Sequence, residues 1–251
     1  MVPWGIATAF PGRAAARGLH VLQPTGTSFE ARPLMLTPFE SRAARALAEA
    51  PFFGELGKGS MSCLHRTAVR PGELLFAKGE PSHHLYGVIS GRLKVFSDPE
   101  PGREVSLELV APGEILGELG LEAGAPRYAS VKALAHTELA TIPRGKLLPL
   151  LEGRPELRAA LGRAAAETAG RLAQRAEDAA FLSLETRLEK ALADFANRFG
   201  EAVERGTRIR LRQQDLADLL GVSRESVSRA LSGPDLRGRL AVGRGSITLL
   251  R

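Results

Sequence analysis

The chain has 251 residues, of which 44% are hydrophobic and 25% charged, and its formal net charge at pH 7 is +6. This length and composition are typical of a globular chain that buries a sizeable core and divides into two domains. No apolar run approaches the roughly 20 residues that cross a bilayer, and no hydrophobic stretch with a cleavage pattern opens the chain, so we expect a cytoplasmic protein with no membrane partner.

The reactive side chains give little support to redox or metal chemistry. A single cysteine, Cys63, excludes an intramolecular disulfide and any four-thiolate iron-sulfur cluster built within one chain. His83 and His84 are adjacent, so on an extended segment their side chains point to opposite sides and are poorly arranged to bind one metal ion. No metal site is predicted.

The first part of the chain has no sustained hydrophobic period. Residues 1–34 are rich in Gly, Pro, Ala and Arg, so we expect a tail with little fixed structure. A better pattern begins at Met35, which gives the hypothesis that the functional protein starts near this methionine and that the preceding residues are a tail or an over-long gene model. A short helix is predicted from about Thr37.

The next region alternates short apolar runs with glycine and proline turns. Turns every eight to twelve residues or so, between runs with partial alternation, predict a double-sheet jelly roll over residues 35–152. With helices after it, the fold class is α+β. The expected strands are 73–77, 85–89, 92–96, 104–110 and 128–134.

A long helix is predicted from Pro155 to about Leu182, where Ala and Leu dominate without interruption by proline. An Ala-rich stripe with roughly heptad spacing suits close pairing with a second copy, so 153–182 is expected to be a dimerisation helix of a homodimer. Packing on the helix's own domain is the alternative. The stripe consists of Leu157, Leu161, Ala165, Thr168, Leu172, Arg175 and Ala179.

The last part, 183–251, begins with an amphipathic helix at about 184–199 and continues into two short helical patterns joined at Gly221. Glycine permits the sharp turn, and Ser223 is a suitable N-cap for the second helix. Because Ser232-Gly-Pro-Asp235 interrupts the pattern, this helix is expected to stop near Leu231. The segment 239–250 resembles a terminal hairpin or wing. Together these elements predict a winged helix-turn-helix.

The second helix carries the residues that suit DNA recognition. Arg224, Glu225, Ser228 and Arg229 fall within an arc of roughly 140°, opposite an apolar face. In a major groove, arginine can donate to guanine O6 and N7, and a carboxylate can accept from the cytosine amino group. The alternative for each residue alone is a solvated face, with Glu225 favouring the positive helix N-terminus. Weaker DNA-contact candidates, equally explained as polar surface, are Ser223, Ser226, Ser228, Gln213 and Gln214.

The charge distribution favours double-stranded DNA as a partner. Residues 205–251 contain ten arginines and four acidic residues, a net charge of +6 that equals the charge of the whole chain. The positive field is therefore concentrated where the helix-turn-helix lies.

Three motifs in this order resemble the cyclic-AMP receptor protein family, the CRP/FNR transcription regulators. Pro112-Gly-Glu-Ile-Leu-Gly-Glu-Leu-Gly-Leu121 followed by Pro126-Arg-Tyr-Ala129 is similar to the phosphate-binding cassette. Ala180-Phe-Leu182 is similar to the end of the family's long helix, and Ser223-Arg-Glu-Ser-Val-Ser-Arg229 to its recognition helix. The resemblance implies a homodimer on an inverted-repeat promoter site, with RNA polymerase as a partner.

The resemblance also implies an effector pocket. In members that bind cyclic AMP, the cassette glutamate holds the ribose and the arginine holds the cyclic phosphate; those roles fall here to Glu118 and Arg127, with Gly117 and Leu119 framing the turn. Tyr128 stands where the family usually has a hydroxyl donor of Ser or Thr. The effector-facing positions of the long helix fall on Leu172 and Ala173.

The chain thus lacks two sets of cyclic-AMP contacts. The pocket is then empty, binds another effector or is filled by Tyr128, and a Glu118–Arg127 pair that stabilises the turn is the structural alternative. We expect cyclic AMP to bind weakly or not at all and the apoprotein to bind DNA. No cofactor is predicted.

The function that these patterns predict is a sequence-specific transcription regulator. The alternative is a cyclic-nucleotide-responsive module that acts through a protein partner, which would not require the arginine-bearing face. An enzyme is not predicted, because no nucleophile motif or metal-ligand spacing is evident.

Overall fold

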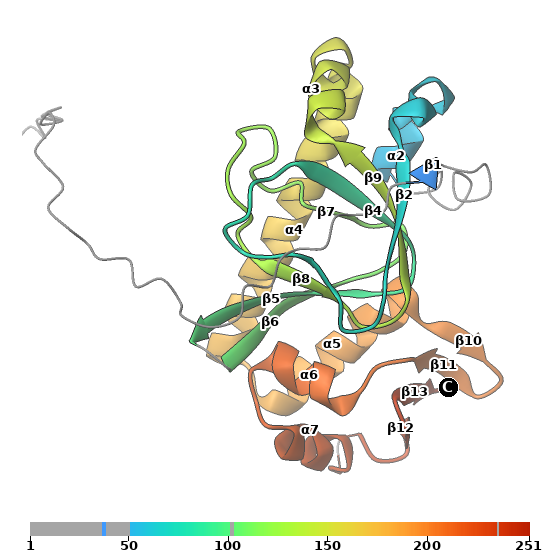
Figure 1. The fold of residues 1–251 in the computed structure, drawn as a ribbon. Helices are drawn as coiled ribbons and strands as arrows, with labels where there is room; N and C mark the ends of the chain where they lie inside the picture. The colour runs from blue at the N-terminus through green and yellow to red at the C-terminus, as the bar shows by residue number, and fades with distance from the viewer. Residues whose placement is uncertain (1–36, 39–50, 101–102, 235) are drawn as a thin grey trace, which may run out of the picture. The chain divides into compact units, whose positions relative to one another are not determined.

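The structure is a computed structural model, and it describes residues 37–38, 51–100, 103–234 and 236–251. A β-roll is followed by a long helix and then by a smaller α/β unit (Figure 1). The expected tail, 1–34, lies outside the described residues. No helix in these ranges is long and apolar enough to span a membrane.

The β-roll consists of two sheets, so the predicted jelly-roll class is confirmed. One sheet has the order β1-β2-β9-β4-β7 and the other β3-β8-β5-β6, with antiparallel neighbours throughout. The strands are β1 Thr37–Pro38, β2 His65–Val69, β3 Leu74–Phe76, β4 His84–Ser90, β5 Leu93–Glu100, β6 Arg103–Val110, β7 Ile115–Leu116, β8 Ser130–Ala133 and β9 Thr137–Pro143.

The β-roll buries its core between the sheets because alternate residues of each strand point inward. Val88, Leu93 and Val131 are each at most 1% exposed there. The helix expected from Thr37 is wrong at its start, because Thr37 and Pro38 form a strand that pairs with β2. The remainder of that expected helix up to residue 50 lies outside the described residues.

Helices close one end of the β-roll and lead out of it. Phe53, Leu147 and Leu157 meet in a second apolar cluster in which α2, α3 and the first half of α4 pack together. The elements are α2 Pro51–Leu56, the 3-10 helix η1 Lys58–Cys63, α3 Arg144–Gly153 and α4 Pro155–Phe181.

The long helix α4 has the predicted start, with Pro155 in its first turn, where the missing N–H costs nothing. The expected heptad stripe does not supply a free face. Leu157, Leu161 and Thr168 are buried against the chain's own body, so the packing alternative holds for this part of the stripe.

A different stripe of α4 is exposed instead. Seven small residues alternate at spacings of three and four, the a and d positions of a heptad. All seven are exposed: Ala159, Gly162, Ala166, Ala169, Ala173, Ala176 and Ala180. We call this set the small-residue seam.

The C-terminal unit is a winged helix-turn-helix, as predicted. A four-stranded sheet of order β10-β11-β13-β12 adjoins three helices around a core that includes Leu188, Leu216 and Ile247. The elements are α5 Leu184–Phe199, β10 Glu201–Val203, β11 Gly206–Ile209, α6 Gln213–Leu220, α7 Arg224–Leu231, β12 Leu240–Gly243 and β13 Ser246–Leu250.

Local chemistry explains the helix boundaries in this unit. Gly221 ends α6 at φ 68°, in the left-handed region that favours glycine. Ser183 and Ser223 cap α5 and α7, each accepting a hydrogen bond from the backbone N–H three residues later. The expected ranges of α5 and α7 and the turn at Gly221 are confirmed.

Candidate functional site

Helix α7 has one side in the core and one in solvent. Val227, Ala230 and Leu231 are buried. Because these residues anchor the helix, its other side is held outward on the molecule. The structure brings Arg224, Glu225, Ser228 and Arg229 together on that exposed side.

The hydroxyls of Ser223, the N-cap of α7, and of Ser226, in its first turn, hydrogen-bond to each other at the start of the helix. Ser223 Oγ accepts from Ser226 N at 3.1 Å, and the two hydroxyls lie 3.0 Å apart. Arg229 Nη2 donates to Ser226 Oγ at 3.4 Å. As direct DNA contacts, Ser223 and Ser226 are therefore weaker candidates than the arginines.

Glu225 carries a charge at neutral pH. Its own backbone N–H, then the Ser223 hydroxyl, hydrogen-bond the carboxylate and hold its pKa below the usual range. This arrangement agrees with the sequence alternative, in which the acid favours the helix N-terminus. The carboxylate also remains exposed, so it stays available as an acceptor.

A groove beside α7 adds residues that the sequence patterns did not single out. A cleft of about 340 Å³ runs between the start of α6, the start of α7 and the turn joining β12 to β13. Three arginines line it: Arg212, Arg224 and Arg244. Gln213 and Gln214 also line it, so the weaker candidates of α6 share one surface with the arginine-bearing helix. The charge count included Arg212 and Arg244, but only the folded wing places them here.

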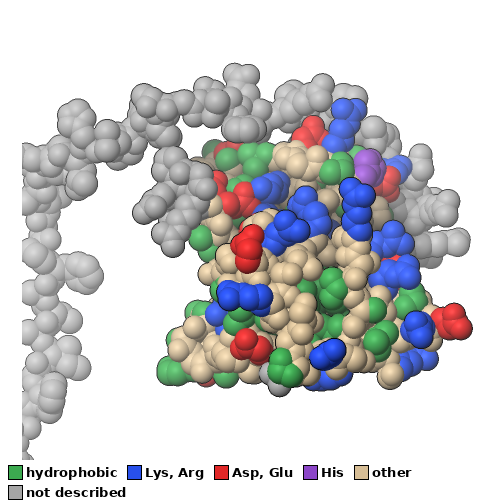
Figure 2. All heavy atoms as spheres, turned by 90° about the horizontal axis from the view of Figure 1, so that it is seen from below, with side chains coloured by type: hydrophobic (Ala, Val, Ile, Leu, Met, Phe, Trp, Pro, Cys, Tyr) green, Lys and Arg blue, Asp and Glu red, His purple; other side chains and the backbone are tan. Residues whose placement is uncertain are grey.

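Seen from the end that carries α6 and α7, the molecule presents Lys and Arg side chains over much of its face, with fewer acidic ones (Figure 2). Ion pairs occupy some of these arginines: Arg212 Nη2 lies 2.9 Å from Asp215 Oδ1 and Arg210 Nε lies 2.9 Å from Glu201 Oε1. An exposed helix beside a cationic groove suits a DNA duplex. The helix can enter the major groove and meet base edges, while the cationic groove meets phosphates.

The arginine of the cassette in the β-roll is hydrogen-bonded to the chain's own backbone. Arg127 is 5% exposed, and its two terminal nitrogens donate to Gly117 O at 3.0 Å and His84 O at 2.6 Å. Its guanidinium also lies 4.2 Å from the centre of the Phe76 ring. The backbone at Gly117 has φ 84°, and a Cβ there would stand 2.4 Å from Arg127 Nη1, so the arginine and the glycine turn fit each other.

Glu118 is buried on the other side of the cassette turn. Burial raises the pKa of its carboxyl, against a hydrogen bond from its own backbone and one from Thr168 in α4. Among the described residues Glu118 and Arg127 do not form the ion pair of the structural alternative: Arg127 donates to Gly117 O and His84 O, and Glu118 bonds to Thr168. Leu119 lines the same cavity.

The cavity at the cassette is almost closed. It measures about 20 Å³, which is room for about one water molecule. Tyr128 lines it and remains 39% exposed, and the alternative that this ring fills the pocket stays a prediction. Leu172 and Ala173 are not among the lining residues, and Ala173 is exposed on the small-residue seam. Their role as effector positions stays a prediction.

An ion pair that the sequence patterns did not predict lies beside this cavity, which Glu108 lines. Glu108 of β6 is 2% exposed, and its Oε1 lies 2.6 Å from Nε of Arg171 in α4. Arg171 also donates to Thr168 Oγ1 at 3.2 Å. The pair joins β6 of the β-roll to the long helix α4 beside the cassette cavity. Its partners are 63 residues apart, so no local pattern could reveal it.

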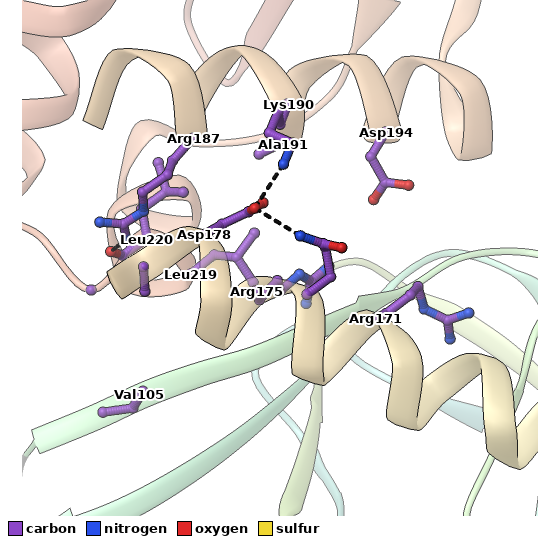
Figure 3. Close-up of a pocket in the computed structure, with 13 residues that line it drawn as sticks. Val105, Arg171, Arg175, Asp178, Arg187, Lys190, Ala191, Asp194, Leu219 and Leu220 are labelled. Atoms are coloured by element: carbon purple, nitrogen blue, oxygen red, sulfur yellow. Dashed lines mark hydrogen bonds and ion pairs between the residues drawn. The ribbon is translucent and has the colours of Figure 1, made fainter. Parts of the chain in front are cut away.

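A larger cavity, of about 420 Å³, lies where α4, α5 and α6 meet. Figure 3 shows its polar side chains bonded to one another: Asp178 accepts from Lys190 at 2.7 Å and from Gln174 at 3.0 Å. Arg187 donates to the carbonyl of Leu220 at the end of α6. The described residues contain no group of three side chains that could hold a metal ion.

Comparison with known proteins agrees with this architecture. Residues 66–154 match the cyclic nucleotide-binding domain, and residues 186–251 match the Crp-like helix-turn-helix domain. The CRP-like cAMP-activated global transcriptional regulator of Mycobacterium tuberculosis is 32% identical over 169 residues, which cover 66% of this chain and 75% of the relative. The cAMP-activated global transcriptional regulator CRP of Escherichia coli is 32% identical over 162 residues, covering 62% and 76%.

A solved structure resembles this chain over both the β-roll and the DNA-binding unit. The c-di-GMP responsive global regulator CLP of Xanthomonas campestris superposes with a TM-score of 0.66 at 26% identity, covering 81% of this chain and all of that one. Fold and site together define a helix-turn-helix regulator with a cyclic-nucleotide-binding type of sensor domain. The chain belongs to the CRP/FNR family of DNA-binding transcription regulators.

Proposed function

We propose that the chain binds an inverted-repeat DNA site as a homodimer and that it does so without cyclic AMP. The observation that supports binding without cyclic AMP is the small size of the cassette cavity. Ligand pockets measure roughly 300–1,000 Å³, whereas this cavity measures about 20 Å³. The relatives from M. tuberculosis and E. coli are named as cAMP-activated.

The contacts that an effector makes in such a pocket are made here by the chain itself. Arg127 donates to two backbone carbonyls, and Glu118 bonds to Thr168. The Glu108–Arg171 pair ties β6 to α4. A cyclic nucleotide would have to displace these contacts, and separating the pair would leave the buried Glu108 carboxylate without its cation. The chain's own side chains therefore supply a link between the β-roll and α4.

The small-residue seam supports the homodimer. Seven Ala and Gly residues at a and d spacing allow two helix backbones to approach closely, and they are the exposed stripe of α4. Two copies related by a twofold axis would present two α7 helices to successive major grooves about 34 Å apart. An inverted-repeat site matches that symmetry.

The arginine-bearing face of α7 and the adjoining groove supply the DNA contacts. Arg224, Glu225 and Arg229 suit base readout, and Ser228 lies on the same face. Arg212, Arg244, Gln213 and Gln214 suit phosphate contacts along the groove. The alternative function, a cyclic-nucleotide-responsive module acting through a protein partner, requires a nucleotide space that the described cavity does not offer. We also propose RNA polymerase as a partner and the cytoplasm as the location, by analogy with the family's transcription regulators.

Selection of bound sequences from random DNA, with and without cyclic AMP, tests the proposal. We expect the same twofold-symmetric sequence under both conditions. Calorimetry on the free protein should detect no cyclic AMP binding at micromolar concentration. Strict dependence of DNA binding on cyclic AMP would contradict the ligand-free mechanism, and an asymmetric selected sequence would contradict the homodimer.

A further inference from the structure

The DNA-binding unit is docked on the β-roll through helix α6. Helix α6 lies against strand β6 (Figure 1). Leu109 of β6 is fully buried within the same apolar cluster as Leu188 and Leu216 of the C-terminal unit. This docking decides where α7 stands relative to the rest of the protomer.

A lysine is buried in that contact. Lys94 of β5 is 3% exposed and pairs in register with Leu109, so its side chain leaves the β-roll on the face that meets α6. Its Nζ lies 2.9 Å from Asp218 Oδ2 of α6, and it also bonds Glu104 of β6. One buried cation is therefore shared by a carboxylate of the β-roll and a carboxylate of the DNA-binding unit.

The two carboxylates keep this lysine charged. Burial alone would lower the pKa of the ammonium, but hydrogen bonds and opposite charges from Glu104 and Asp218 outweigh burial and raise it. Moving α6 away from β5 would leave Lys94 with Glu104 as its one carboxylate partner and would take the ammonium group away from Asp218. Because a buried charge without its partner is costly, the pair favours one docked position strongly over neighbouring ones.

Asp218 also reaches the DNA-facing side of α6. Its Oδ1 accepts from Gln214 Nε2 at 2.7 Å while its Oδ2 holds Lys94. Gln214 is exposed and lines the arginine groove. A single carboxylate thus connects the β-roll to a residue of the candidate DNA surface.

The α4 side of the DNA-binding unit is less closely packed. Only Leu182 and Ser183 separate α4 from α5, and the cavity of about 420 Å³ lies between α4, α5 and α6 (Figure 3). The Asp178–Lys190 ion pair bridges α4 and α5 there, but a cavity offers fewer close-packed contacts than a filled interface. Other contacts on the β-roll side reinforce the docking: Arg198 with Glu114, and Arg92 with the carbonyl of Arg210.

We infer that Lys94 and Asp218 are a positioning pair that fixes the recognition helix relative to the dimer axis, and so sets the half-site separation that the dimer accepts. This inference rests on the proposed binding of an inverted repeat by two copies. Neither residue needs to touch a base. Adding one base pair between half-sites shifts them by about 3.4 Å and rotates them by about 35°, which a rigidly positioned pair of helices does not tolerate.

The test compares Lys94→Met with Lys132→Met. Lys132 is the matched control because it bonds the same Glu104 but stays within the β-roll sheet. Full-length proteins are titrated against the selected symmetric site, the same site with one base pair added or removed at its centre, and a duplex with a single half-site. Circular dichroism and thermal melting verify folding, and Asp218→Asn serves as a second variant that removes the charge from the other partner.

For the wild type and Lys132→Met we expect at least roughly tenfold weaker binding when the spacing changes. Lys94→Met and Asp218→Asn should bind the optimal site about tenfold more weakly, bind the half-site within about twofold of wild type, and lose much of the spacing penalty. An unchanged spacing penalty in both variants would overturn the inference, as would tighter binding, which would mark the docked position as inhibitory. A wild type without spacing preference or symmetric site would instead refute the proposed function.

Discussion

Arg224 and Arg244 line the same groove from different supports, and we expect them to contribute differently to DNA binding. Arg224 is on the rigid start of α7, where it can reach base edges. Replacing it with alanine should cost about 1–3 kcal/mol on the cognate site and relax preference at one base pair. Electrophoretic titration against cognate and single-substituted sites measures both effects.

Arg244→Ala is the matched comparison for that substitution. Arg244 stands on the turn between β12 and β13 and suits a phosphate, so its loss should weaken cognate and random DNA about equally. The slope of log affinity against log salt should also fall by about 0.9. If Arg224→Ala behaves in this same uniform way, Arg224 is not a base reader.

Glu118 should make the protein's stability depend on pH. Because burial raises the pKa of this carboxyl in the folded state, its contribution is fully present below the ordinary carboxyl pKa and is lost as the pH rises through the folded value. Glu118→Gln is neutral at every pH, so the variant should gain stability relative to wild type as the pH rises from acidic to neutral.

Urea unfolding of both proteins across that pH range measures the difference. Glu122→Gln, which removes an exposed carboxylate from the same loop, controls for the change in net charge. Parallel stability curves for wild type and Glu118→Gln would contradict the buried, protonation-sensitive position.

At the scale of elements, the seam on α4 allows a sharp test of dimerisation. Ala173→Lys places two ammonium groups and two long side chains on the twofold axis, so we expect a monomer in analytical ultracentrifugation and loss of tight DNA binding. Gln174→Lys adds the same charge at the next exposed position, about 100° round the helix, and should remain dimeric. A dimeric Ala173→Lys protein would place the interface elsewhere.

The sequence predicted several elements well because their signals are local. Ser223 and the breaker after Leu231 bound α7, and an uninterrupted Ala/Leu run bounds α4. The same helix shows where local patterns fail. Its heptad stripe was placed by the larger residues, such as Leu157 and Leu161, and those residues pack on the β-roll side. The face left for a partner consists of alanines and glycine, which carry no hydrophobic contrast that a sequence could reveal.

For the candidate sites, too, the sequence predicted residues that belong to contiguous motifs and missed those that meet only in the folded chain. Arg127, Glu118 and the exposed face of α7 come from contiguous motifs, and the structure places them in the cassette and on the outer surface. Glu108 and Arg171, which pair beside the cavity, come from a strand and a helix far apart in the chain. Their meeting depends on how the β-roll packs against α4, which no local spacing encodes.

For the whole molecule, the closed cavity predicts an asymmetry between two ligands. A ligand that binds only the folded state increases the free energy of unfolding, by about 2.7 kcal/mol when its concentration is one hundred times its Kd. The melting temperature rises accordingly. Duplex DNA carrying the selected site should therefore raise the melting temperature, whereas millimolar cyclic AMP should leave it unchanged. A rise with cyclic AMP, measured by differential scanning fluorimetry, would show that the cavity opens.

The Glu108–Arg171 pair has a consequence for how a cell would use such a regulator. If the chain's own side chains replace a small-molecule effector, promoter occupancy depends on the number of protein molecules in the cell. Synthesis and degradation of the protein set that number. If dimers dissociate within the working range of concentrations, the concentration of dimer rises with the square of the monomer concentration. A modest change in expression then gives a steeper change in output, without any metabolite being sensed.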